Sequence, residues 1–80
     1  MNITLRQLQV FAKVAETGSF TRAGEALFLT QPAVSQQIRL LTEQVGEPLL
    51  ESIGRKTFLT APGRELLETW QRMAQEWQQF

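Results

Sequence analysis

A break between two helical patterns constrains the fold of this 80-residue chain more than any other feature. A short helical run ends near Phe28, and a second helix begins at Thr30 with Pro32 in its first turn. The second helix carries an apolar stripe at intervals of four, three and four, formed by Val34, Ile38, Leu41 and Val45. Because this spacing stacks side chains on one face of a helix, we expect the stripe to be core and the two helices to pack together.

The opposite face of the second helix is polar but lacks the lysine and glutamate mixture of an ordinary surface. Its outward residues near the helix start are Gln31, Pro32, Ala33, Ser35 and Gln36. Glutamine can pair bidentately with adenine, and small side chains allow close approach to thymine methyl groups in a major groove. Arg39, one turn further, suits a phosphate. The pair of helices therefore has the outline of a helix-turn-helix, with a merely solvated helix face as the alternative.

Composition narrows the classes of function. The chain has no cysteine and no histidine, which removes thiolate metal sites, disulfides and the usual general base. The glutamate pairs 43/47 and 65/68 have no metal-ligand partner, so we expect no cofactor, no metal and no enzyme. No long apolar run or signal-peptide pattern occurs, which predicts a cytoplasmic protein without a membrane partner.

The net charge of zero hides an uneven distribution. Residues 1–64 contain seven cations and five glutamates, whereas residues 65–80 contain one arginine and three glutamates. The mildly basic front of the chain permits nucleic-acid binding without requiring it.

The first two helices are predicted from their caps. Thr4 and Gln7 form a capping box before a helix at residues 5–16. Gly18 then ends that helix, and Ser19 or Thr21 caps the next one. In this next helix Phe20 is a predicted core anchor, and Gly24 is an awkward interior residue that costs about 1 kcal/mol relative to alanine.

A small hairpin, or wing, is predicted after the break at Gly46 and Pro48. Its tip contains Gly54, Arg55 and Lys56, which suit a phosphate or a narrow minor groove. A hairpin tip kept soluble by charge is an equally good interpretation of these residues alone.

The final helix should begin at Thr60, with Pro62 in its first turn. Large apolar side chains recur along it at heptad spacing, namely Leu66, Trp70, Met73, Trp77 and Phe80. A helix of about 18 residues is about 27 Å long, more than this small core can cover. We therefore expect a second copy or a further domain to cover the stripe, and we favour a dimer interface over a ligand cage or a base-stacking platform.

Eight segments together carry a family resemblance that covers about residues 3–68. In order they are LRQL (5–8), GSFTRA (18–23), TQPAVS (30–35), QI (37–38), VG (45–46), PL (48–49), GR (54–55) and LT (59–60). Their order and spacing resemble the amino-terminal DNA-binding domain of the LysR-type transcriptional regulators. Residues 30–38 are similar to regulators of carbon-fixation genes.

The resemblance implies a mainly α fold, a winged helix-turn-helix of three helices and a two-stranded wing, followed by a long linker helix. Residues 1–60 would form the DNA-binding domain, and residues 61–80 a linker helix that pairs two subunits antiparallel. An effector-binding domain would follow in a longer regulator, and a small-molecule effector would bind only there. The resemblance also implies a nucleoid-associated homodimer, or a tetramer of the full-length protein.

The family's pattern of DNA contacts can be carried over by position. It implies binding to an interrupted palindrome of double-stranded DNA, with the third helix in the major groove and the wing at the minor groove. The implied base-facing residues are Gln31, Pro32, Ser35 and Gln36, the implied phosphate contacts are Ser19, Thr21, Gln37 and Arg39, and Arg55 is the implied wing contact. Gln36 and Ser52 replace usual arginines and Leu40 replaces a usual polar or basic residue, so we expect a shallower salt dependence.

A hypothesis from another class is a protein-interaction module. It would dimerise through the linker helix, and its winged fold would touch no DNA.

Overall fold

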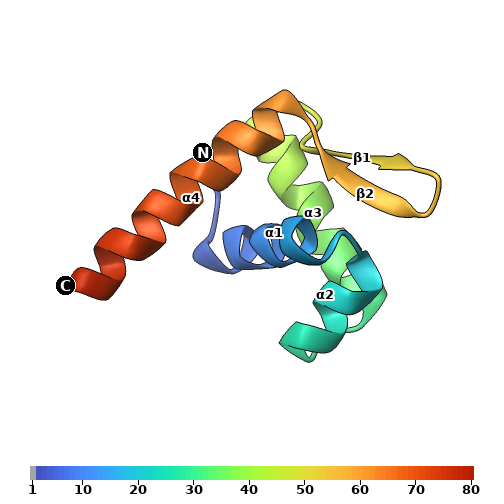
Figure 1. The fold of residues 1–80 in the computed structure, drawn as a ribbon, viewed down its shortest axis with the longest axis horizontal. Helices are drawn as coiled ribbons and strands as arrows, with labels where there is room; N and C mark the ends of the chain where they lie inside the picture. Colours follow the sequence, from blue (N-terminus) through green and yellow to red (C-terminus); the bar gives the residue numbers. More distant parts are fainter. Residues whose placement is uncertain (1) are drawn as a thin grey trace.

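The computed structural model describes residues 2–80, which form four helices and one antiparallel pair of strands (Figure 1). The elements are α1 (Leu5–Thr17), α2 (Phe20–Leu27), α3 (Gln31–Val45), β1 (Leu50–Ile53), β2 (Lys56–Leu59) and α4 (Ala61–Gln79). The predicted winged helix-turn-helix with a long final helix is confirmed.

Local hydrogen bonds explain where α1 and α2 begin. The Gln7 backbone N–H donates to Thr4 Oγ1 at 3.1 Å, and the Thr4 N–H donates to Gln7 Oε1 at 3.0 Å, which confirms the capping box. Gly18 ends α1 with a φ of 69°, in the left-handed region that glycine tolerates. The cap of α2 is Ser19, whose Oγ accepts the Arg22 N–H at 3.1 Å, and Thr21 lies inside the first turn.

The core lies between α1, α2 and α3, with Leu49 closing it from the segment before the wing. Its buried apolar members are Leu8, Val10, Phe11, Val14, Ala23, Val34, Ile38, Leu41 and Leu49. Three members of the predicted α3 stripe are therefore core, while Val45 is half-buried at the margin and packs against it. Phe20 is likewise half-buried against this core.

Gly24 has a packing role that its helix propensity does not reveal. A Cβ added there would lie 2.6 Å from the carbonyl oxygen of Leu29 and 3.4 Å from a methyl carbon of Val34. The predicted cost of Gly24 relative to alanine does not hold at this position, because alanine would collide with the Leu29 carbonyl where the chain turns into α3. Glycine is what allows α2 and the turn to approach so closely.

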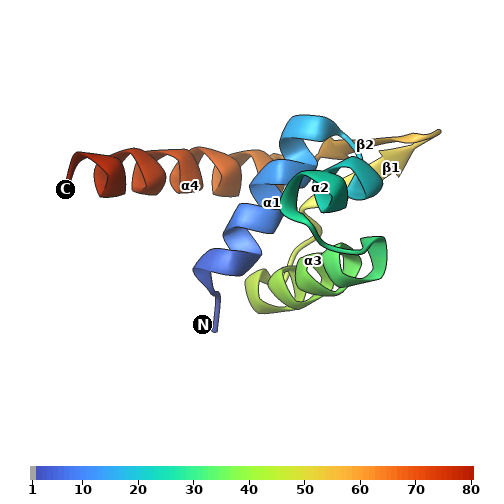
Figure 2. The ribbon, with the colours of Figure 1, turned by 90° about the horizontal axis from the view of Figure 1, so that it is seen from below.

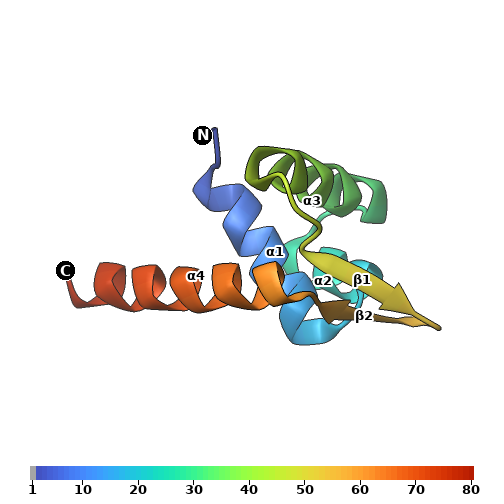
Figure 3. The same cartoon turned by 90° about the horizontal axis from the view of Figure 1, so that it is seen from above.

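The elements are arranged so that α4 and the wing leave the core in opposite directions along the longest axis. Views from below and above show α3 on one side of α1 and α4 on the other (Figures 2 and 3). The molecule measures 38 × 27 × 20 Å along its principal axes. Among residues 2–80, no helix combines the length and the apolarity needed to cross a membrane.

Candidate nucleic-acid interface

The outward face of α3 presents the polar side chains that the sequence singled out. The helix begins after Thr30, whose Oγ1 accepts the Ala33 N–H at 3.3 Å, and Pro32 occupies its first turn. Four of the predicted α3 residues are exposed and three are half-buried. The exposed ones are Gln31, Pro32, Gln36 and Arg39, and the half-buried ones are Ala33, Ser35 and Gln37.

Two of these side chains are bonded to each other. Gln31 Nε2 donates to Ser35 Oγ at 2.7 Å across one turn of α3. The bond uses one amide hydrogen of Gln31, so its carbonyl oxygen and its second hydrogen can still meet a base edge. Ser35 also keeps its hydroxyl hydrogen as a donor. The contact therefore orients Gln31 while leaving it able to form a bidentate pair.

The wing is a tight hairpin joined to the start of α2. Ile53 pairs with Lys56 across the strands, which leaves Gly54 and Arg55 as a two-residue loop. Gly54 has a φ of 64°, as the first loop position of such a hairpin requires. Close to this loop, at the second residue of β2, the Thr57 N–H donates to the Gly18 carbonyl at 3.2 Å. This bond fixes the wing against the α1–α2 junction.

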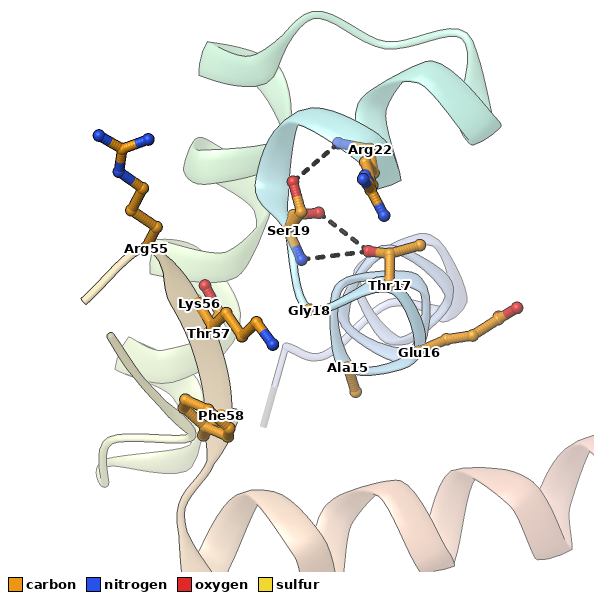
Figure 4. Close-up of a pocket in the computed structure, with 10 residues that line it drawn as sticks. All are labelled: Ala15, Glu16, Thr17, Gly18, Ser19, Arg22, Arg55, Lys56, Thr57 and Phe58. Carbon is orange, nitrogen blue, oxygen red and sulfur yellow. Dashed lines mark hydrogen bonds between the residues drawn. The ribbon is translucent and has the colours of Figure 1, made fainter. Parts of the chain in front are cut away.

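A basic notch lies between the wing and that junction (Figure 4). We define the notch by residues 15–19, Arg22 and residues 55–58, which line it. The Lys56 side chain points across the notch toward the junction, whereas Arg55 points away from it (Figure 4). The start of α2 also lies there, and the first N–H groups of a helix have no intrahelical partner. The positive end of the helix dipole and Lys56 together favour an anion in the notch.

The one carboxylate that lines the notch does not oppose this preference. Glu16 Oε2 lies 3.0 Å from Lys13 Nζ, and its side chain points to the far side of α1 (Figure 4). The ion pair is on the surface, so it contributes little to stability, but it turns the negative charge outward.

The structure unites some predicted site residues and separates others. Ser19 and Lys56, which are 37 positions apart in the chain, line the same notch. Arg55 lies at the wing tip, and Thr21 is exposed on the first turn of α2. Arg22 lines the notch but was missed from the sequence, although its place three residues after the Ser19 cap is a usable signal.

The five residues predicted for the dimer interface do not share one environment. Leu66 and Trp70 are half-buried and pack against the core of their own chain. Met73, Trp77 and Phe80 are exposed by 45%, 74% and 92%, and the rings of Trp77 and Phe80 meet edge to face at 5.7 Å. An apolar groove runs between α1 and this part of α4, lined by Leu5, Gln9, Trp70, Met73, Ala74, Trp77 and Gln78.

Three packed helices, a two-stranded wing and an outward amide-rich face on α3 define the class: a winged helix-turn-helix domain of the DNA-binding kind. Within that class, residues 5–64 match the family described as bacterial regulatory helix-turn-helix proteins, lysR family. The chain belongs to this family. Its members are transcriptional regulators and not enzymes.

Two relatives and one solved structure illustrate the likeness. The chain is 58% identical over 67 residues to the transcriptional activator CmpR of Synechocystis sp., covering 84% of this chain and 22% of CmpR. It is 56% identical over 63 residues to the RuBisCO operon transcriptional regulator of Acidithiobacillus ferrooxidans, covering 79% of this chain and 20% of that regulator. The fold matches a crystal structure of a CbnR DBD–DNA complex with a TM-score of 0.88 and 34% identity, covering 95% of this chain and 87% of that one.

These relatives confirm the predicted resemblance to regulators of carbon-fixation genes. The chain spans about a fifth of the length of the curated relatives that it matches.

Proposed function

We propose that this chain binds double-stranded DNA sequence-specifically as a homodimer, with α3 in the major groove and the wing at the adjacent minor groove. The observation that carries this proposal is the outward face of α3, where Gln31 is held by Ser35 beside the exposed Gln36. Residues 1–60 form the DNA-binding unit in this proposal, and residues 61–80 form the linker helix.

Base readout rests on the amides of Gln31 and Gln36. Each can pair with the N6 and N7 atoms of an adenine, and the Gln31–Ser35 bond reduces the entropy lost when the pair forms. Pro32 and Ala33, in the same first turn, let the helix approach thymine methyl groups.

Phosphate contacts rest on the notch and on the sides of α3. A phosphate in the notch meets Lys56, Arg22 and the first N–H groups of α2, next to Ser19 and Thr21. Gln37 and Arg39 reach the backbone on the other side of the groove. Arg55 enters the minor groove in this proposal, which its direction away from the notch at the wing tip supports (Figure 4).

Dimerisation rests on the exposed end of α4. Met73, Trp77 and Phe80 form an apolar face that a second, antiparallel α4 covers, with Leu66 and Trp70 extending it toward the core. Two-fold symmetry then predicts an inverted repeat with a fixed spacer. In a longer regulator a small-molecule effector binds another domain, the assembly is a dimer or a tetramer, and the protein resides on the cytoplasmic nucleoid.

Selection from a random duplex pool, followed by fluorescence anisotropy, tests the proposal. We expect the selected inverted repeat to bind on the order of 10³-fold more tightly than a scrambled duplex of equal length at physiological salt. Equal affinity for the two duplexes would contradict sequence-specific binding.

A further inference from the structure

The start of α4 is joined to the segment before the wing by an unusually close contact at Gly63. This glycine is buried in the third position of the helix. A Cβ added to it would overlap the carbonyl oxygen of Leu49 and lie 3.0 Å from the carbonyl carbon. It would also lie 3.2 Å from Leu59 Cδ2. The backbone of α4 therefore rests directly on the backbone of residue 49.

The Leu49 side of this contact cannot move easily. The Leu49 carbonyl accepts the Thr60 N–H at 3.1 Å, and the Leu49 side chain is only 1% exposed in the core. Thr60 Oγ1 donates to the Pro48 carbonyl at 2.6 Å and accepts the Gly63 N–H at 3.1 Å. Two hydrogen bonds thus tie the N-cap of α4 to residues 48–49, and a third holds Gly63 to that N-cap; we call this arrangement the α4 joint.

A small displacement at the α4 joint becomes large at the far end of the helix. The 19 residues of α4 span about 28 Å, and Gly63 lies three residues, or about 4.5 Å along the axis, from the N-cap Thr60. Moving the helix by about 1 Å there, enough to relieve the overlap with a methyl group, tilts it by about 12° and shifts its far end by about 6 Å. Consecutive base pairs of DNA are only about 3.4 Å apart.

We propose that Gly63 is a specificity-determining residue for the spacer between two DNA half-sites, because it sets the direction in which α4 leaves the DNA-binding unit. This inference rests on the dimeric DNA binding proposed above. Gly63 lies in none of the proposed base or phosphate contacts, so a side chain at this position changes which spacer is bound and leaves the reading of a single half-site intact.

Anisotropy titrations with a series of spacers test this inference. The probes are labelled duplexes that carry the half-site selected by the wild-type chain, either once or as an inverted repeat whose spacer changes by one base pair at a time. The wild-type chain should prefer one spacer, and the avidity gained from the second half-site, about 10²-fold or more, should be lost at poor spacers. Gly63→Ala should move the best spacer by at least one base pair and bind the single half-site within about twofold of wild type.

A second pair of variants loosens the α4 joint without adding a clash. Thr60→Val removes the hydroxyl that bonds Pro48 and Gly63, and Thr60→Ser retains it. Thr60→Val should flatten the spacer preference to within about threefold, while Thr60→Ser and the exposed neighbour Glu65→Gln should keep the wild-type profile. Thermal melting identifies any variant that fails to fold, and Thr60→Val decides the matter if Gly63→Ala is one.

The two proposals fail in different ways. A wild-type chain that binds every spacer and the single half-site equally would overturn the dimeric DNA binding and, with it, the role of Gly63. A wild-type chain that selects a spacer, together with folded Gly63→Ala and Thr60→Val proteins that select the same spacer equally sharply, would overturn the role of Gly63 alone.

Discussion

The helices α3 and α4 carry the same apolar spacing but end in opposite environments. In α3 the stripe that begins at Val34 is covered by α1 and α2, and Leu41 is fully buried. In α4 the stripe starts against the core at Leu66 and becomes steadily more exposed, until Phe80 is almost fully accessible. Intervals of four and three residues therefore predict an apolar helical face, but they do not tell what covers it.

The polar faces of the two helices also differ, and in a way that bears on function. The outward face of α4 mixes Glu65, Glu68, Arg72 and Glu76, as a solvated surface does. The outward face of α3 instead offers amides, a hydroxyl and small side chains, with Arg39 one turn further. The outward face of α4 therefore serves as an internal reference for the composition of an ordinary solvated face, from which the outward face of α3 differs.

Core truncation should give the largest difference between the helices. Leu41→Ala leaves a cavity in the centre of the core and should lower the free energy of unfolding by about 2–5 kcal/mol. Trp77→Ala, measured at dilutions where the chain is monomeric, should lower it by less than about 1 kcal/mol because this side chain is mostly exposed. Urea denaturation measures both. An equal loss for the two variants would mean that the chain itself covers the end of α4.

Charge on the exposed part of α4 should act on association. Trp77→Glu should weaken dimerisation by about 2–4 kcal/mol, because a carboxylate would then be buried in the apolar seam. Trp77 is a cleaner target than Trp70, which also packs on its own core. Sedimentation equilibrium measures the effect, with Gln75→Glu as a control that places the same charge on the other side of the helix. An unchanged sedimentation profile for Trp77→Glu would remove α4 from the dimer interface.

An amide deleted from α3 should act on DNA specificity. Gln36→Ala should weaken binding to the selected duplex by about 1–3 kcal/mol, change binding to the scrambled duplex much less, and leave dimerisation intact. The matched control is Gln71→Ala, which removes the same side chain from an exposed position on α4. Anisotropy measures both. If the two substitutions were equivalent, the chain would be better described as a protein-interaction module.

Removing the notch lysine should give the smallest effect. Lys56→Gln should weaken binding to both duplexes alike and reduce the slope of log affinity against log salt by about one unit. Lys13→Gln supplies the control, because Lys13 is paired with Glu16 and lies outside the residues that line the notch. Titrations at several salt concentrations measure the slope. Equal slopes for wild type and Lys56→Gln would contradict the proposed contact between Lys56 and a phosphate in the notch.

Local patterns predicted most of the fold, because caps and periodicity are encoded within a few residues. The Thr4–Gln7 capping box and the α3 stripe are of this kind. Contacts between distant segments were not predictable in the same way. Nothing near Gly63 in the chain indicates that the carbonyl oxygen of Leu49, fourteen residues earlier, lies against it.

The candidate site likewise has a part that local sequence patterns predict and a part that depends on contacts between distant segments. The amide-rich face of α3 follows from spacing alone, whereas the notch forms where the wing lies against the α1–α2 junction, which the Thr57–Gly18 hydrogen bond joins. This is why Lys56 could be predicted as a basic tip residue but Arg22 could not be predicted as its neighbour across the notch.

The stoichiometry of the complex tests most directly the idea that α3 reads DNA while α4 pairs two copies. Sedimentation of a labelled duplex with the wild-type chain should give two chains on the selected inverted repeat. The Trp77→Glu variant should bind the same duplex far more weakly. Two results would contradict the division of roles between α3 and α4. One is a single chain per inverted repeat, and the other is equal affinity of Trp77→Glu and wild type for that repeat.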